Sequence, residues 1–228
     1  MWANWIGLEA QRQRLLKKAG PGPLRDYLSV PFPDRRSPID TVDIVSLDFE
    51  TTGMDKTYSR ILSAGYIELK HGEIKLETAR HVFFKNDSPL NEASVIVHGI
   101  TDDKASTGES LETAIPRLLE AMMGKVILSH HSRIERTFLQ QACKRLYGLS
   151  PIFPMIDTLA LAKKRLEQRN QPIEHGSLRL FALRESYGLP RCRAHNALSD
   201  ALATAELFLA QLAHMDYKRP PSLGSLMS

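Results

Sequence analysis

The chain has very few cysteines and no long apolar run. Its 228 residues contain only two cysteines, Cys143 and Cys192, at a separation that fits neither a metal-binding nor a redox motif. No apolar segment approaches the roughly 20 residues that span a bilayer. The N-terminus lacks the basic and apolar regions of a secretory signal. We therefore expect no disulfide framework, no membrane insertion and a cytoplasmic location.

The composition is that of an ordinary globular protein, at 43% hydrophobic and 25% charged residues. This length can bury one substantial core. The net charge of +4 is modest but uneven, because residues 163–193 hold eight Lys or Arg against three Glu. A basic stretch beside an acidic centre suits a site that handles a polyanion. Solvated helix faces would give the same pattern, so the charge alone leaves both explanations open.

The sequence divides into three parts. Residues 1–20 have helical apolar spacing, whereas the five prolines within residues 21–38 predict an arm without regular structure. We expect this N-terminal helix and Pro-rich arm, residues 1–40, to dock on the main domain, with protein-partner binding as the alternative. The main domain covers 41–215, and the polar segment 216–228 is expected to be a flexible, frayed tail.

Within the main domain, strand patterns come first and helical patterns follow. The expected strands are 43–49, 61–69, 74–84, 95–97, 126–129 and 154–157, with a turn at His71–Gly72. The expected helices are 111–123, 134–146, 158–168, 177–187 (capped by Ser177) and 197–215. Such an order predicts an α/β fold with an antiparallel meander at one side of a mixed sheet and helices flanking it.

Two carboxylates end the first strand, in the segment Val45–Gly53. Side chains two apart in a strand share a face, so Asp48 and Glu50 should project together. Paired carboxylates repel each other unless a cation lies between them, and hard divalent ions take such ligands. Alone, the pair could equally be two solvated acids at a strand end.

Three residues farther along the chain favour the metal site. His195 precedes the last helix, Asp200 lies in its first turns, and Glu135 opens the helix after strand 126–129. In an α/β sheet, strand ends and helix starts meet at one edge, so these side chains could converge on Asp48 and Glu50. Carboxylates that hold two divalent ions, with a histidine as the base, suit two-metal phosphodiester hydrolysis.

Several segments, taken in order, resemble the DnaQ-like (DEDDh) 3′–5′ exonuclease family, and in particular the proofreading epsilon subunit of bacterial DNA polymerase III. The first motif corresponds to residues 46–53 and the second to residues 128–139. Residues 97–101 resemble the loop that borders the nucleotide, and residues 194–201 the third motif. Supporting matches are 156–159 and 176–178. Together these segments cover residues 43 to 213.

This resemblance implies a ribonuclease H-like sheet and an enzyme that releases nucleoside 5′-monophosphates from DNA 3′ ends. The metal ligands would be Asp48, Glu50, Glu135 and Asp200, with two Mg²⁺ or Mn²⁺ ions, and His195 would be the general base. The substrate contacts would be Thr51, Thr52, His98, Arg191 and Arg193. Asp157 is expected to cap a helix, and His130 and His131 to pack or to border the substrate.

The second motif departs from the family pattern at two positions, with Glu135 where Asp is usual and His131 where Asn is usual. The added methylene of Glu135 puts the second metal in question. Two other functions therefore stay open: an RNA exonuclease similar to RNase T, and a non-catalytic protein that binds nucleic-acid ends or a replication partner. The short segment after residue 215 lacks the polymerase-tethering extension of epsilon subunits, so we expect a stand-alone enzyme.

Overall fold

The described chain folds around one mixed sheet of five strands, in the order β3-β2-β1-β4-β5. The computed structural model describes residues 3–53, 59–86, 106–192, 195–215, 217 and 219–227, with side chains from residue 7 onward. The strands are β1 (Ile44–Thr51), β2 (Ile61–Lys70), β3 (Glu73–Phe83), β4 (Val126–Ser129) and β5 (Met155–Asp157). β1, β2 and β3 pair antiparallel, whereas β1, β4 and β5 pair parallel. The predicted mixed sheet with its meander is confirmed.

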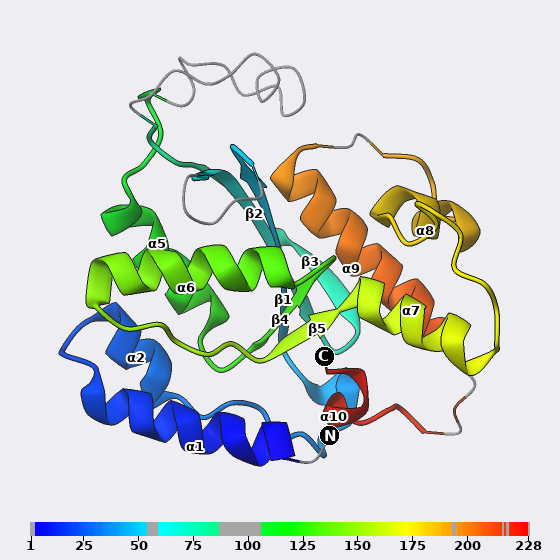
Figure 1. Cartoon of the computed structure of the whole chain (residues 1–228), viewed down its shortest axis with the longest axis horizontal. Coiled ribbons are helices and arrows are strands. Elements are labelled where there is room, and N and C mark those ends of the chain that lie inside the picture. Colours follow the sequence, from blue (N-terminus) through cyan, green and yellow to red (C-terminus); the bar gives the residue numbers. More distant parts are fainter. Residues whose placement is uncertain are drawn as a thin grey trace.

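Helices cover both faces of this sheet (Figure 1). The longer helices are α1 (Ala3–Lys18), α5 (Leu111–Met122), α6 (Arg133–Tyr147), α7 (Thr158–Gln168) and α9 (Ala197–Ala213). The short ones are α2 (Pro23–Ser29), η1 (Ile39–Thr41), α8 (Leu180–Ser186) and α10 (Leu223–Leu226). α1, α2, α5 and α6 lie on one side of the sheet, and α7, α8 and α9 on the other. The predicted strand 95–97 lies outside the described residues.

Strand β1 is central because its alternating side chains serve both faces. Leu47 and Phe49 belong to the core cluster shared with α5 and α6. Ile44 belongs to the second cluster, with Phe208 of α9. Each face therefore has its own apolar core, and the side of β1 that begins at Ile44 continues, two residues at a time, to Asp48 and Glu50.

The arm between residues 21 and 38 was expected to lack regular structure, and that prediction is wrong for α2. Pro23 stands at the start of this helix, where a fixed φ and a missing N–H are tolerated. Leu24, Tyr27 and Leu28 are buried in the same core cluster as α5. Proline spacing thus marks the ends of this helix and does not prevent it.

Residues 216–228 were expected to form a frayed tail, but α10 in this segment packs against the rest of the chain. Leu223 and Leu226 of α10 are buried in the second core cluster. The Ile39 N–H donates to the Pro221 carbonyl, and the Leu223 N–H donates to the Ser37 carbonyl. Two apolar side chains spaced by one helical turn, together with these backbone bonds, fix the segment against the arm. The predicted domain limits themselves remain predictions.

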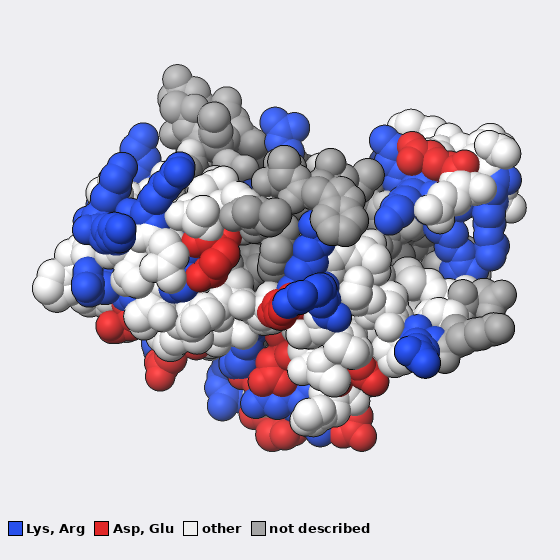
Figure 2. All heavy atoms as spheres, turned by 90° about the horizontal axis from the view of Figure 1, so that it is seen from below, with Lys and Arg blue, Asp and Glu red and all other residues white. Residues whose placement is uncertain are grey.

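One helix starts later than predicted. α8 begins at Leu180 and not at Ser177, because the Ser177 hydroxyl donates to the Glu174 carbonyl in a separate turn and Gly176 has φ +81°. Among the described helices, none combines the length and apolar character needed to cross a bilayer. Figure 2 shows Lys and Arg side chains gathered at the left and right of one face, the sides on which α1 and α7 lie.

Candidate metal centre

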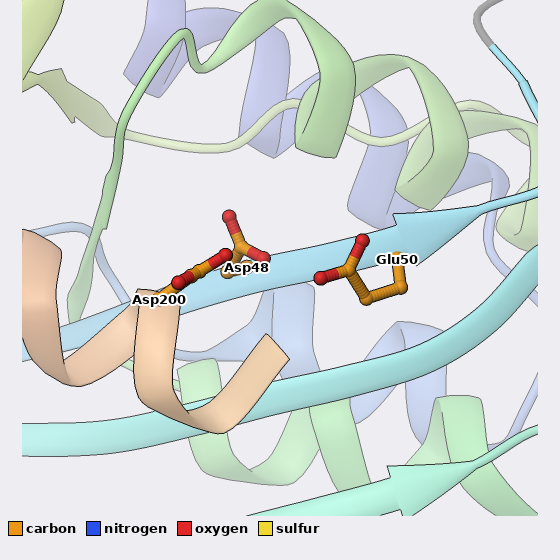
Figure 3. A group of neighbouring side chains, drawn as sticks. All are labelled: Asp48, Glu50 and Asp200. Carbon is orange, nitrogen blue, oxygen red and sulfur yellow. The ribbon is translucent and has the colours of Figure 1, made fainter. Parts of the chain in front are cut away.

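Three carboxylates from two elements converge near the carboxyl end of the central strand β1. Asp48 and Glu50 come from β1 and Asp200 from the first turn of α9 (Figure 3). One oxygen of each lies within 4.8 Å of the others. Glu50 is 6% exposed and Asp200 is 8% exposed, while Asp48 is partly buried. The predicted convergence of these three residues is what the structure shows.

A glycine lets α9 approach the sheet this closely. Gly65 of β2 is the cross-strand partner of Asp48, and a Cβ on it would lie 2.1 Å from the Ala197 carbonyl carbon and from the Leu198 nitrogen. The buried Ser46 hydroxyl donates to the Ala201 carbonyl over 2.7 Å. Missing volume on β2 and one polar contact on β1 therefore set the position of α9, and with it Asp200.

The start of α9 is built by local hydrogen bonds. The Asn196 side chain caps the helix by accepting from the Ser199 N–H at 3.1 Å. The Asp200 Oδ2 accepts from the His195 N–H at 3.0 Å, and His195 itself is exposed with φ +63°. The other oxygen, Asp200 Oδ1, is buried and has no hydrogen-bond partner among the described residues. His195 thus lies beside the carboxylates, and its backbone is tied to one of them.

The carboxylates raise each other's affinity for protons. Burial, followed by the charges of Glu135, Asp200 and Glu50, holds the pKa of Asp48 well above its usual range. Burial and the Glu50 charge raise the pKa of Asp200 to about 7, opposed by the His195 N–H and the Arg184 charge. A cation would relieve both repulsion and desolvation. The all-oxygen donor set and the unpartnered Asp200 Oδ1 fit a hard divalent ion such as Mg²⁺ or Mn²⁺.

Glu135 lies deeper than the other acids. It is 2% exposed in the first turn of α6, and within the part of the chain that the structure describes its Oε2 has no hydrogen-bond partner. Burial, with a smaller contribution from the Asp157 charge, raises its pKa to about 8, although backbone hydrogen bonds of Glu135 and Phe49 act against the rise. Its charge acts on Asp48, yet it is not among the three residues whose oxygens cluster. The structure therefore places Glu135 near enough to act on Asp48 but outside the three-carboxylate cluster.

Asp157 fixes the position of two helices at once. Its Oδ1 accepts from Leu159 and Ala160 at the start of α7, and also from His131. Its Oδ2 accepts from the Ser132 N–H at 2.9 Å, at the start of α6. The predicted cap is confirmed, and it extends to the helix that carries Glu135.

The remaining predicted residues lie around this centre. The Thr51 hydroxyl donates to the Gly53 carbonyl, and the Thr52 hydroxyl accepts from the Arg60 N–H, so both also shape the turn after β1. Arg191 is exposed and pairs with Glu185 at 3.2 Å. His130 packs as one of the two expected alternatives, with its ring nitrogens 2.8 Å from the Thr158 hydroxyl and 3.0 Å from the Leu178 carbonyl.

His131, the residue after His130, has φ +71°. His98 and Arg193 lie outside the described residues, so their predicted substrate contacts remain predictions.

Comparison with known proteins identifies the family. The RNase T exonuclease family model matches residues 45–208, a range that includes all the carboxylates above. The chain belongs to this exonuclease family. The DnaQ-like resemblance inferred from the motifs is thereby confirmed.

Curated members of the exonuclease family that match the chain include PolC-type DNA polymerases III. That of Thermotoga petrophila is 32% identical over 173 residues, which are 76% of this chain and 12% of the polymerase. That of Thermotoga maritima is 33% identical over 165 residues, 72% of this chain and 11% of the polymerase. The chain thus spans about an eighth of the length of these curated relatives.

Solved exonuclease structures share the fold. Exonuclease I of E. coli in complex with single-stranded DNA has a TM-score of 0.67 at 18% identity, covering 76% of this chain and 41% of that one. Exonuclease I of Methylocaldum szegediense has a TM-score of 0.63 at 20% identity, covering 76% of this chain and 41% of that one. At this identity the likeness concerns the architecture.

Two contributors to the site were missed from the sequence. Gly65 interrupts a strand that is otherwise β-prone, and an interior strand glycine signals close backbone approach. Ser46 precedes Asp48 by two residues, so the alternation already placed it on the face that α9 covers. The alternation of β1 and the interior glycine of β2 were the available signals.

Proposed function

We propose that the chain is a metal-dependent 3′–5′ exonuclease that hydrolyses DNA phosphodiesters and releases nucleoside 5′-monophosphates, with single-stranded or frayed ends as substrate. The observation that carries the proposal is the cluster of Asp48, Glu50 and Asp200, whose oxygens lie within 4.8 Å of one another. Family membership supports the reaction class. The PolC-type relatives are DNA polymerases, and the E. coli exonuclease I structure contains single-stranded DNA, which favours DNA over RNA.

The carboxylates would hold the ions. Asp48, Glu50 and Asp200 would bind the first, while Asp48 would bridge to a second that Glu135 supports. Divalent ions at such a site supply electrophilic polarisation of the phosphate and a lower pKa for the attacking water. Burial, and after it the charges of the neighbouring carboxylates, holds the pKa of Asp48 well above its usual range and raises the pKa of Asp200 to about 7, and a bound cation would relieve both effects.

His195 would take the proton from the attacking water. Its side chain is exposed next to the cluster, while its N–H is bound to Asp200 Oδ2. The water oxygen forms a bond to phosphorus and the bond from phosphorus to the 3′ oxygen breaks. Transfer of the water proton to His195 makes the water oxygen a stronger nucleophile for that attack, and the departing 3′ oxygen takes up a proton from solvent. The bond from its N–H to Asp200 fixes the backbone of this base beside the carboxylates.

Substrate contacts would come from the rim of the site. Thr51 ends β1 directly after Glu50 and Thr52 follows it in the turn, where a terminal nucleotide would lie. Arg191 would bind a backbone phosphate, because its exposed pair with Glu185 is of the kind that contributes little and is easily exchanged. His98 and Arg193 are proposed on the sequence resemblance alone. Residues 1–40 remain a candidate for contact with a protein partner, and stand-alone action remains part of the proposal.

The deciding experiment is digestion of matched DNA and RNA oligonucleotides carrying a 3′ label, in Mg²⁺ or Mn²⁺. We expect stepwise release of nucleoside 5′-monophosphates from DNA, and loss of release in Asp48→Ala and His195→Ala. The exposed acid Asp40 provides a matched control, since Asp40→Ala should retain wild-type activity. Full activity in either site variant would overturn the assignment.

Two other results would replace the proposal. Faster digestion of RNA would favour the RNase T-like alternative. No digestion, combined with one weak ion site or none in a calorimetric titration, would favour a non-catalytic protein that binds nucleic-acid ends.

A further inference from the structure

Arg184 is a buried cation in an otherwise apolar contact between α8 and α9. It is 3% exposed in α8, and the apolar cluster that joins α8 to α9 contains Leu180, Leu183, Ala203 and Leu207. Its Nη1 donates to the Ala203 carbonyl at 2.8 Å and pairs with Glu206 Oε2 at 2.7 Å. Its Nη2 donates to the Pro190 carbonyl at 3.0 Å. One guanidinium therefore connects α8, α9 and the segment that follows α8.

The segment that begins at Pro190 ends at His195. Arg184 holds its upstream end through the Pro190 carbonyl, and Asp200 Oδ2 holds its downstream end through the His195 N–H. Ala203, the other carbonyl bound by Arg184, lies three residues after Asp200 on the same helix. Hydrogen bonds thus hold both ends of the segment in position relative to the first turns of α9.

Packing alone does not require an arginine at this position. Burying a guanidinium is costly unless it is paired and hydrogen-bonded, and an apolar side chain of similar volume would fill a contact lined by leucine and alanine. What arginine adds is a rigid fork with several donors, which can bind carbonyls of two segments in a fixed relative position. The cost of burial is offset here by contacts to the two segments that flank the site.

We propose that Arg184 is a positioning residue for His195: it binds the Pro190 and Ala203 carbonyls and so holds α8 against α9, the helix whose Asp200 binds the His195 N–H. This inference rests on the proposed function, in which His195 is the general base. It assigns to Arg184 no contact with substrate or ion. Its effect on the reaction passes through the position of α9, which holds the His195 N–H through Asp200.

The test is a double-mutant cycle on DNA digestion with Arg184→Lys and His195→Ala. Lysine keeps the charge but lacks the fork, so we expect kcat to fall about 10- to 100-fold, the range for residues that orient a functional side chain. The segment also carries Arg191 and Arg193, the proposed phosphate contacts, so the KM for the oligonucleotide is expected to rise as well, and kcat is the readout for His195. In the His195→Ala background, Arg184→Lys should have no further effect on kcat, since the base that it positions is gone.

A matched control separates positioning from general loosening. Leu207→Ala opens the same contact between α8 and α9 without touching the segment. It should lower Tm, but should leave kcat nearly unchanged at temperatures well below unfolding. If Arg184→Lys does not fold, Arg184→Gln takes its place, since its neutral amide leaves no unpaired charge in the contact.

The outcomes distinguish the inference from the proposed function. Equal losses of kcat from Arg184→Lys with and without His195 would overturn the positioning role, as would wild-type kcat in Arg184→Lys. Either result leaves the exonuclease proposal standing as long as His195→Ala alone is impaired. Wild-type activity in His195→Ala would instead overturn the base assignment.

Discussion

Gly65 of β2 lies directly against Ala197, the first residue of α9, with no room for a side chain between them. Gly65 is also the cross-strand partner of Asp48. The distance between the two halves of the carboxylate cluster is therefore set by a residue that carries no functional group. One methyl group at this position would move Asp200 away from Asp48.

We predict that Gly65→Ala lowers nuclease activity far more than its size suggests. The added Cβ would lie 2.1 Å from backbone atoms of Ala197 and Leu198, which cannot rotate away as a side chain would. A displacement of about 1 Å at a catalytic centre can cost about 100-fold in rate, and overpacking costs about 1–3 kcal/mol in stability. Activity on labelled DNA and Tm measure the two effects.

Gly20→Ala is the control, because a Cβ on Gly20 would meet nothing within 4 Å. It should leave both quantities unchanged. Wild-type activity in Gly65→Ala would show that α9 does not need this close contact.

Asp200→Asn should inactivate the enzyme and stabilise the metal-free protein. The amide removes a charge that repels Glu50, and its one oxygen can still accept from the His195 N–H. Because each pKa unit corresponds to about 1.4 kcal/mol and 1 kcal/mol to about 2–4 °C in a chain of this size, Tm in a chelator should rise by several degrees. Loss of activity together with a lower Tm would mean that the variant misfolds, and would contradict the prediction.

The raised pKa values predict how metal-free stability depends on pH. Glu135, with a pKa raised from 4.5 to about 8, binds its proton more tightly in the folded state than in the unfolded chain. Its contribution is therefore fully present below about pH 4.5 and is lost as pH rises to about 8. Wild type should lose Tm relative to Glu135→Gln as pH rises from 5 to 8, measured by thermal unfolding in a chelator.

Added Mg²⁺ or Mn²⁺ should recover more Tm at pH 8 than at pH 6, because the ions compete with protons for the same carboxylates. A constant difference between wild type and Glu135→Gln across this range would contradict the assignment of the shift to Glu135.

Asp157→Asn separates the two helix ends that Asp157 holds. Asparagine caps helices as well as aspartate does, so its oxygen can keep the bonds to Leu159 and Ala160 of α7. Its NH₂ group would face the Ser132 N–H, which would lose its acceptor at the start of α6. We expect the free energy of unfolding to fall by about 1–3 kcal/mol, which is the cost of an unsatisfied buried donor.

Activity should fall with it, because α6 carries Glu135. Hydrogen exchange would localise the change, with faster exchange in the first turn of α6 and little change in α7. Equal exchange in both helices would contradict a separate role at α6.

The sequence allowed the architecture and three of the carboxylates to be predicted because both follow from short-range periodicity. Period-two alternation placed Asp48 and Glu50 on one face, and a helix start placed Asp200. The arm and the tail were mispredicted because short-range patterns do not show which distant residues a segment packs against. Pro23 was counted as a breaker, although it suits a first turn, and Leu223 and Leu226 acquire their role only when Ile39 is beside them.

Long-range contacts account for the rest of the site. Nothing near Arg184 in the sequence says that its donors reach Pro190 and Ala203, since the helix packing that buries it is a tertiary property. The depth of Glu135 was open for a similar reason: its reach depends on where Asp157 fixes the start of α6.

The fixed start of α6 also determines the effect of Glu135→Asp, which restores the residue usual in the family. A shorter carboxylate could reach the site only if α6 moved toward it. The bonds from Asp157 to the His131 and Ser132 amides hold the helix start in place. Glu135 is 2% exposed, so its missing methylene would leave a gap inside the protein.

We therefore expect Glu135→Asp to lose about 10- to 100-fold in activity, as for residues that support a metal ligand, and to weaken the second ion in a calorimetric titration. Activity above wild type would instead mean that the longer Glu135 carboxylate is a poor fit for that ion.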